Sequence, residues 1–70
     1  MFAPIGIFLC RKCKIELYDA NKTYVNNDHL VFREECDYGY NVICKGCHTI
    51  LGFTKKDEHH IKSSCLIYVS

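Results

Sequence analysis

Two Cys-x-x-Cys motifs constrain this 70-residue chain more than any other feature of its sequence. The first knuckle occupies residues 10–13 (CRKC) and the second occupies residues 44–47 (CKGC). Each motif can present two thiolates from one tight turn, and four sulfurs complete a tetrahedral shell around a zinc ion. The spacing therefore predicts one structural zinc ion, with the ligands Cys10, Cys13, Cys44 and Cys47.

The length of the chain explains why a metal would be needed. A domain this small buries a modest share of its surface, and its core typically supplies no more than about 3 to 5 kcal/mol. Hydrophobic residues make up 49% of the sequence and charged residues 24%, as in globular proteins. We expect residues 1–70 to form a single zinc-stapled domain. Because four cysteines would leave no open position for water, we do not expect an enzyme.

Cysteine use also bears on the compartment. Six cysteines could form three disulfides in a secreted miniprotein, but residues 1–9 lack the basic start and cleavage site of a signal peptide and are too short to span a bilayer. We therefore expect an intracellular, reduced protein that does not enter a membrane. With four thiolates and one zinc ion, the formal net charge of +1 falls by two, to −1, which is weak for a nucleic-acid binder.

Several basic side chains cluster at and beside the knuckles. They could form an anion-binding patch, or they could offset the negative charge of the zinc-thiolate centre, which we favour because they lie within the motifs. These residues are Arg11, Lys12, Lys14, Lys45, Lys55 and Lys56.

Alternation of apolar and polar residues predicts short strands along most of the chain. We expect strands over residues 5–9, 14–18, 38–43, 50–53 and 61–69, and a hairpin that joins 23–25 to 29–32 through the turn-forming residues 26–28. Gly52 suggests a bulge or a close backbone approach. Residues 55–60 look polar and exposed, and 54–63 could contain one helical turn. The predicted class is a small all-β protein in which two hairpins each end in a knuckle, with the zinc ion between them.

The remaining chemically active side chains have less specific interpretations. The string from Cys44 to His48 matches a c-type haem attachment motif, but that interpretation leaves the first knuckle unexplained. His59 and His60 could bind a metal, yet adjacent side chains on a strand point to opposite faces, so we expect solvated polar residues. Cys36 and Cys65 could form a redox pair, but we expect small buried apolar side chains.

Aromatic residues give the best indication of a binding surface. Five Tyr and four Phe exceed what so small a core can hide, so several should be exposed. Exposed aromatic residues are enriched at protein interfaces, although cross-strand packing on a thin sheet would also explain them. Our candidates for a contact surface are Phe2, Ile5, Tyr38, Tyr40, Ile67 and Tyr68.

Three segments together resemble the Yippee and Mis zinc-domain family: residues 7–13 (IFLCRKC), 43–53 (ICKGCHTILGF) and 64–66 (SCL). In that family, a Leu-Gly-aromatic tripeptide follows the second Cys-x-x-Cys and a Cys-Leu pair lies in the closing strand. The resemblance implies a β-tent, in which two short antiparallel sheets are joined at a zinc site with four cysteine ligands. Those ligands would be Cys10, Cys13, Cys44 and Cys47.

The same resemblance implies a function. Mis members are dimeric or larger scaffolds that license deposition of the centromeric histone variant, and Yippee members are largely nuclear. The segment between the knuckles is shorter here than is usual in the family, and the sequence ends without the C-terminal helix of Mis proteins. We expect a non-enzymatic protein-interaction module that acts as a self-associating nuclear scaffold for chromatin or centromere-type assemblies, with a protein partner or a homodimer and no small-molecule substrate.

Related tents supply the alternatives. Residues 9–14 also resemble the opening of the C-terminal domain of RIG-I-like receptors, which reads RNA ends, so an RNA-end or nucleic-acid-binding zinc domain is the second hypothesis. Methionine sulfoxide reductases have a similar zinc site and a separate catalytic cysteine, a role that Cys65 would have to take. The cereblon type binds small ligands in a tryptophan cage, and this sequence has no Trp.

Overall fold

The computed structural model describes residues 6–20, 23–26 and 28–69, and everything below refers to these residues. They form eight short β-strands and no α-helix, so the predicted all-β class is confirmed. A single turn of 3-10 helix, η2 (Ser63–Cys65), precedes the last strand. The strands are β1 (Ile7–Cys10), β2 (Glu16–Asp19), β3 (Thr23–Asn26), β4 (His29–Arg33), β5 (Asn41–Ile43), β6 (Ile50–Lys55), β7 (Glu58–Lys62) and β8 (Leu66–Val69).

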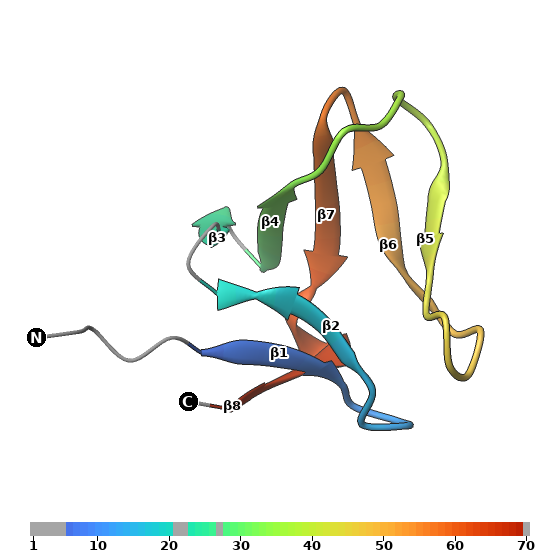
Figure 1. The fold of residues 1–70 in the computed structure, drawn as a ribbon. Helices are drawn as coiled ribbons and strands as arrows, with labels where there is room; N and C mark the ends of the chain where they lie inside the picture. Colours follow the sequence, from blue (N-terminus) through green and yellow to red (C-terminus); the bar gives the residue numbers. More distant parts are fainter. Residues whose placement is uncertain (1–5, 21–22, 27, 70) are drawn as a thin grey trace, which may run out of the picture.

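The strands form two antiparallel sheets that are inclined to each other like the sides of a tent (Figure 1). The smaller sheet has the order β2-β1-β8 and the larger one has the order β3-β4-β7-β6-β5. The predicted pairing of the 23–25 and 29–32 segments is confirmed, because β3 pairs with β4. In both sheets the strands that flank a knuckle are direct neighbours, β1 with β2 and β5 with β6. Each knuckle therefore lies at the tip of a hairpin, as the sequence predicted.

The core lies between the two sheets. Its buried members are mostly β-branched, aromatic or leucine side chains, and β4, β6 and β7 each contain two consecutive buried residues, so parts of the larger sheet are covered on both faces. Two of the motif cysteines belong to this core, so the knuckles pack against apolar side chains and not only against each other. The buried residues of the cluster are Cys10, Phe32, Val42, Cys44, Leu51, Ile61 and Leu66.

Aromatic contacts connect the two sheets. Tyr18 of β2 stacks on Phe32 of β4, with ring centroids 4.0 Å apart and an interplanar angle of 14°. Phe8 of β1 meets the same ring edge-on, at 5.4 Å. Such aromatic pairs stabilise a core by about 0.5 to 1.5 kcal/mol beyond the area that they bury. They fix the inclination of the smaller sheet on the larger one.

Two predictions for the C-terminal part are wrong. Residues 54–62 form no helical turn, because β6 and β7 form a hairpin that turns at residues 56–57, and the single 3-10 turn begins only at Ser63. The stretch 61–69 is not one strand, since β7 ends at Lys62 and η2 redirects the chain into the other sheet. The expectation for Gly52 is confirmed: a Cβ atom there would collide with the carbonyl group of His60 on β7. Glycine thus allows the two backbones to approach each other.

No helix in residues 6–20, 23–26 and 28–69 is long and apolar enough to cross a membrane.

Candidate metal centre

The four motif cysteines meet at the junction of the two sheets. Their Sγ atoms all lie within 4.8 Å of one another, and none forms a disulfide. The shortest separations are 3.5 Å between Cys13 and Cys44 and 3.7 Å between Cys10 and Cys47. A tetrahedral zinc site with Zn–S bonds of about 2.3 Å places its sulfurs about 3.8 Å apart. The donor set and its dimensions therefore suit a tetrahedral thiolate metal centre.

The two knuckles have the same backbone geometry. In the first, the N–H of Cys10 donates to the carbonyl of Ile15 and the N–H of Lys14 donates to the carbonyl of Cys10, at 3.0 and 2.9 Å. In the second, the N–H of Cys44 donates to Thr49 and the N–H of His48 donates to Cys44, both at 2.9 Å. The fifth residue of each has positive φ, 66° at Lys14 and 63° at His48.

The strands that lead into the knuckles also match. The register between β1 and β2 shifts between Phe8 and Leu9, and that between β5 and β6 shifts between Val42 and Ile43. In each hairpin the extra, unpaired residue lies on the strand that leaves the knuckle, Leu17 in β2 and Leu51 in β6, four residues after the second cysteine. A bulge increases local twist and bends its own strand. The two knuckles therefore adjoin matching irregularities in their outgoing strands.

Hydrogen bonds to sulfur favour the thiolate form in the second knuckle. The N–H of Gly46 donates to Sγ of Cys44 at 3.3 Å, and backbone hydrogen bonds from Cys47 and Gly46 lower the pKa of Cys44. The Thr49 hydroxyl lies 3.2 Å from Sγ of Cys47, and this contact, together with the Thr49 backbone, lowers the pKa of Cys47 to about 6. The second knuckle is therefore prepared to supply negatively charged metal ligands.

In the first knuckle, by contrast, the surroundings of Cys13 disfavour its thiolate form. A backbone hydrogen bond from Ile15 lowers the pKa of Cys13, but burial and the three neighbouring sulfurs outweigh it and raise this pKa to about 11. Thiolates this close repel one another, so the last of them forms only with difficulty. A divalent cation at the centre would remove this penalty, because a coordinating thiol is deprotonated outright.

Gly46 lets the two knuckles approach closely. A Cβ atom at this position would lie 2.8 Å from Sγ of Cys13 and 3.4 Å from Cγ2 of Ile15. No real side chain tolerates the first distance without movement. The glycine of the second motif is therefore explained by the space that the first motif occupies.

Two basic side chains near the first knuckle have structural partners. Arg11 donates from Nε to the Ser64 carbonyl at 2.8 Å and from a terminal nitrogen to the Leu66 carbonyl at 3.2 Å. Lys14 Nζ donates to the Arg11 carbonyl at 2.8 Å. The two Arg11 bonds fasten the knuckle to the start of β8, and the Lys14 bond lies within the knuckle. They add a structural role that neither the anion-patch nor the charge-offset hypothesis contained.

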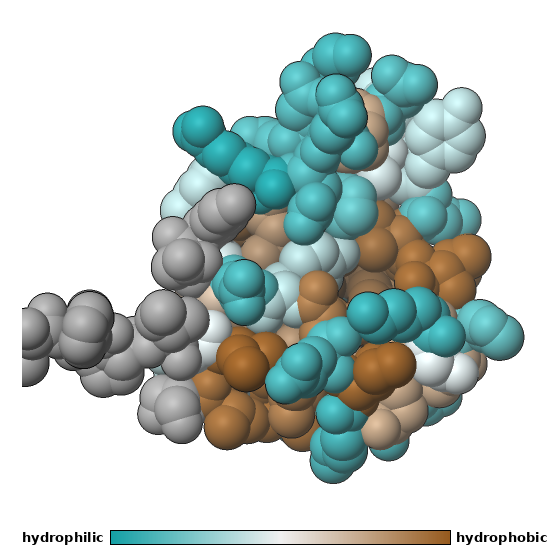
Figure 2. All heavy atoms as spheres, viewed as in Figure 1, coloured by the Kyte–Doolittle hydropathy of each residue, from teal (hydrophilic) through white to brown (hydrophobic). Residues whose placement is uncertain are grey.

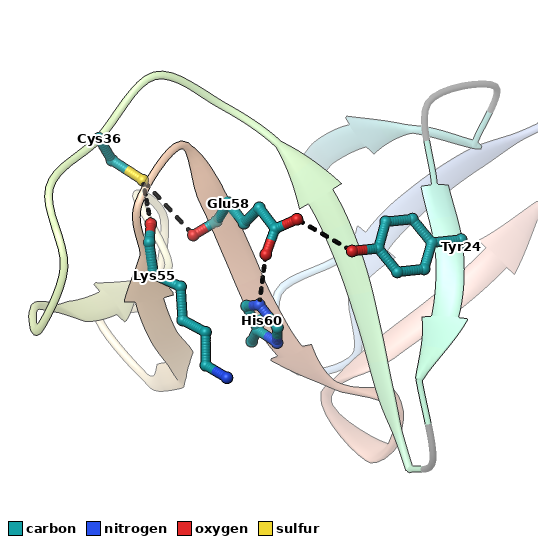
Figure 3. A network of polar contacts seen from close by, with 5 residues as sticks. All are labelled: Tyr24, Cys36, Lys55, Glu58 and His60. Carbon is teal, nitrogen blue, oxygen red and sulfur yellow. Dashed lines mark hydrogen bonds and ion pairs between the residues drawn. The ribbon is translucent and has the colours of Figure 1, made fainter.

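The prediction for the paired histidines is wrong. His60 is buried, and its Nε2 lies 3.0 Å from Oε1 of Glu58, whose other oxygen accepts a hydrogen bond from Tyr24 (Figure 3). His59 points to the other face and hydrogen-bonds through Nδ1 to the Tyr18 hydroxyl at 2.7 Å. Burial lowers the pKa of His59. The prediction that their side chains point to opposite faces is correct, but each is held in a network and is not simply solvated.

Each remaining cysteine has a packing role. Cys65 is half-buried and packs against the core. Cys36 is also half-buried and donates from Sγ to the carbonyls of Lys55 and Glu58, at 3.2 and 3.4 Å, which fastens its loop to the β6–β7 hairpin (Figure 3). Both lie outside the four-sulfur cluster. His48 is exposed and also lies outside it.

The structure does not bring the predicted contact residues together. Tyr38 and Tyr40 are exposed beside the end of the larger sheet, whereas Ile67 and Tyr68 belong to the smaller one. Ile67 and Tyr68 are neighbours on β8 and so face opposite sides of that sheet. Two further candidates, Phe2 and Ile5, lie outside the described residues. The exposure of several tyrosines is confirmed, but they form no single surface.

Comparisons of the chain with protein-family models, with curated proteins and with solved structures found no match. The class that the fold and site define is a small all-β domain with a four-cysteine cluster that could bind zinc. The resemblance to the Yippee and Mis family stays a prediction.

Proposed function

We propose that this protein is a non-enzymatic scaffold domain, held together by one zinc ion and self-associating in the nucleus. The observation that carries the zinc assignment is the tetrahedral spacing of four sulfurs, two of them inside the core. Zinc has no preferred geometry of its own and readily accepts such a shell, and a closed shell of four thiolates serves structure and leaves no position for a substrate. Binding of the ion would close the junction between the two sheets.

The proposed contact surface is the outer face of the smaller sheet. Antiparallel pairing puts Ile7 opposite Val69 and Leu9 opposite Ile67, and none of these four side chains belongs to the core cluster. Alternation along the strands places them on the side that faces away from the larger sheet. Figure 2 shows hydrophobic side chains gathered over the lower part of the molecule, where β1 and β8 lie, and hydrophilic ones over the β6–β7 turn. We call these four residues the aliphatic face.

A second copy of the chain is the occupant that suits this face. The four residues carry no charge, so two copies could bring them together across a two-fold axis. A standard interface takes about 800 Å² from each partner, which is about a sixth of the 5044 Å² surface of this protein. An interface of that size would extend to β2, where Glu16 lies opposite Leu9 and Asp19 opposite Ile7, and these carboxylates would have to lie at its polar rim.

Sedimentation of the zinc-loaded chain tests the scaffold proposal. We expect a dimer that persists in 1 M salt and dissociates when Ile67 is changed to Glu, because apolar association is insensitive to screening. Ile50→Glu is the matched control, since Ile50 is an exposed isoleucine of the larger sheet. A monomer at all concentrations, or dissociation by Ile50→Glu alone, would contradict the proposed surface. Native mass spectrometry of the same sample tests the single zinc ion independently.

Nuclear location and a role in chromatin or centromere-type assemblies belong to the same proposal and are supported only by the family resemblance. Imaging of the tagged full chain, followed by proximity labelling, tests them. Labelling of chromatin proteins by the native chain but not by Ile67→Glu would support a self-associating chromatin scaffold. A uniform cytoplasmic signal would contradict it.

A further inference from the structure

A hollow lies where the β3–β4 turn meets the 3-10 turn, next to the first knuckle, whose Arg11 donates to the Ser64 carbonyl. It has a volume of about 420 Å³, which is within the range of small-ligand sites. The N–H of Ser63 donates to the carbonyl of Asp28 at 3.3 Å and so joins its two walls. The lining residues, which we call the Lys62 hollow, are Asp28, His29, Lys62, Ser63 and Ser64.

An aromatic platform adjoins this hollow. His29, which lines the hollow, meets Phe53 edge-on with ring centroids 5.9 Å apart. Phe53 stacks on His60 at 5.3 Å with an interplanar angle of 15°, and 39% of Phe53 remains exposed. These residues lie on the outer face of the larger sheet, opposite the core. An exposed ring beside a lysine and two serine hydroxyls offers the groups that single-stranded nucleic-acid sites use, a ring to stack on bases and a cation for a phosphate, while Asp28 offsets the charge of Lys62 within the hollow.

We propose that this corner binds one nucleotide unit of single-stranded RNA. The base stacks on the exposed part of Phe53. The phosphate lies between the Lys62 ammonium and the hydroxyl groups of Ser63 and Ser64. The Asp28 carboxylate, which would repel a phosphate, accepts a hydrogen bond from a ribose hydroxyl, as acidic residues do in dinucleotide-binding sites.

The charge distribution confines such a ligand to this end of the sheet. Lys62 lies at the end of β7, and Glu58 lies at its start, beside the acidic loop that follows β4. Four residues of a strand span about 13 Å, so a bound phosphate would lie well away from that loop. The acidic side chains at the far end are Glu34, Glu35, Asp37 and Asp57. Contact with only one or two phosphates predicts modest affinity and a shallow salt dependence, with a slope of log K against log salt of about −0.7 to −1.4.

Two-dimensional NMR titration of the full, zinc-loaded chain tests the proposal. The probes are AMP, inorganic phosphate, and ten-residue oligouridine and oligothymidine. We expect AMP and the RNA to shift the backbone signals of Phe53 and of residues 62–64, and phosphate alone to bind more weakly than AMP. Stronger binding of the RNA than of AMP would identify a strand as the ligand, and equal binding would identify the free nucleotide. No shift with millimolar AMP or RNA would overturn the proposal.

Matched variants separate this site from general electrostatic attraction. Lys62→Glu and Phe53→Ala should each weaken RNA binding about tenfold, whereas Lys55→Glu, the same charge change at the far end of the larger sheet, should leave it nearly unchanged. Asp28→Asn should reduce the preference for RNA over DNA. Equal losses from Lys62→Glu and Lys55→Glu would overturn the site. Phe53→Leu, with unfolding curves for every variant, distinguishes lost stacking from lost folding.

Discussion

The two knuckles have the same backbone but are held in place by different groups. Both have a strand bulge, paired backbone hydrogen bonds and a left-handed fifth residue. The first is fastened to the start of β8 by Arg11, and Lys14 adds a hydrogen bond within the knuckle, to the Arg11 carbonyl. The second has glycine at position 46, which leaves room for Sγ of Cys13 from the first knuckle, and its Thr49 hydroxyl contacts Sγ of Cys47. A repeated geometry therefore need not have repeated side-chain support.

The difference also appears in the thiols. The pKa of Cys13 is raised by burial and the neighbouring sulfurs, despite the Ile15 backbone hydrogen bond that lowers it, whereas the pKa of Cys47 is lowered, first by the Thr49 hydroxyl. Without a cation, ionisation of all four thiols is unfavourable, although hydrogen bonds favour the thiolate form of Cys44 and Cys47. Of the two knuckles, the second is therefore the better arranged to supply thiolates.

Removing the metal should have the largest effect, and it should affect both knuckles equally. Structural zinc contributes on the order of 10 kcal/mol to folding in small domains, more than the core of a 70-residue chain typically provides. A strong chelator such as EDTA should therefore abolish the β-sheet circular dichroism signal, and added Zn²⁺ should restore it. A chain that keeps its fold and its unfolding midpoint in excess chelator would contradict the zinc assignment.

Serine replacement of one ligand should distinguish the buried sulfurs from the surface ones. Cys44 is fully buried and Cys13 is exposed. Both variants lose a ligand, but Cys44→Ser also leaves a hydroxyl in the core, which costs about 1 to 3 kcal/mol when it is unpaired. Urea unfolding with excess Zn²⁺ should find Cys44→Ser the less stable of the two by about that amount. Equal stabilities would show that the burial of Cys44 is unimportant.

Gly46→Ala should break the fit between the knuckles, whereas Lys12→Ala, at the matching position of the first, should not. The added methyl group would lie 2.8 Å from Sγ of Cys13, and overpacking of this kind costs about 1 to 3 kcal/mol. Lys12 is exposed, so its truncation should change the free energy of unfolding by less than about 0.5 kcal/mol. Thermal unfolding of both variants with zinc measures the difference. Equal midpoints would remove the steric explanation for glycine.

The sequence predicted the meeting of the four cysteines and the two hairpins because their signals are local. Two residues between cysteines define a knuckle, and a period of two defines a strand, without knowledge of distant contacts. The hairpin of β3 and β4 was also predicted, because turn-forming residues separate two apolar runs. The matching bulges at Leu17 and Leu51 could have been suspected only by aligning one hairpin with the other.

The failures concern residues whose environment is set by distant strands. His60 is buried because Glu58 and Phe53 surround it on the outer face of the sheet, and His59 is half-buried because β2 brings Tyr18 to it. No local pattern contains that information. The 61–69 segment serves two different sheets, and the polar run from Lys62 to Ser64 was the local signal of the turn between them that the prediction overlooked. The candidate contact residues were dispersed for the same reason.

Thr49→Val should weaken the second knuckle by a smaller amount. The change keeps the shape of the side chain and removes the hydroxyl that lies 3.2 Å from Sγ of Cys47. A hydrogen bond of this kind contributes about 1 kcal/mol, or roughly a fivefold change in zinc affinity. Competition with a chromophoric chelator measures it. Ile15→Val, at the matching position of the first knuckle, is the control, because the isoleucine side chain makes no hydrogen bond that the change could remove. Thr49→Val should therefore lower the zinc affinity more than Ile15→Val does. An equal loss would contradict a role for the hydroxyl.

The left-handed fifth residues give the smallest and most discriminating prediction. Lys14 and His48 have nearly the same positive φ, a conformation that glycine adopts without the steric cost that other residues incur. His48→Gly should therefore stabilise the zinc-loaded protein by about 0.5 kcal/mol after the entropy of glycine in the unfolded chain is included. Lys14→Gly should gain less, because it also removes the hydrogen bond to the Arg11 carbonyl. Thermal unfolding of both variants tests whether the Lys14 side chain stabilises the first knuckle. If Lys14→Gly were as stabilising as His48→Gly, the hydrogen bond of Lys14 would contribute nothing. The two knuckles would then differ less than their contacts indicate.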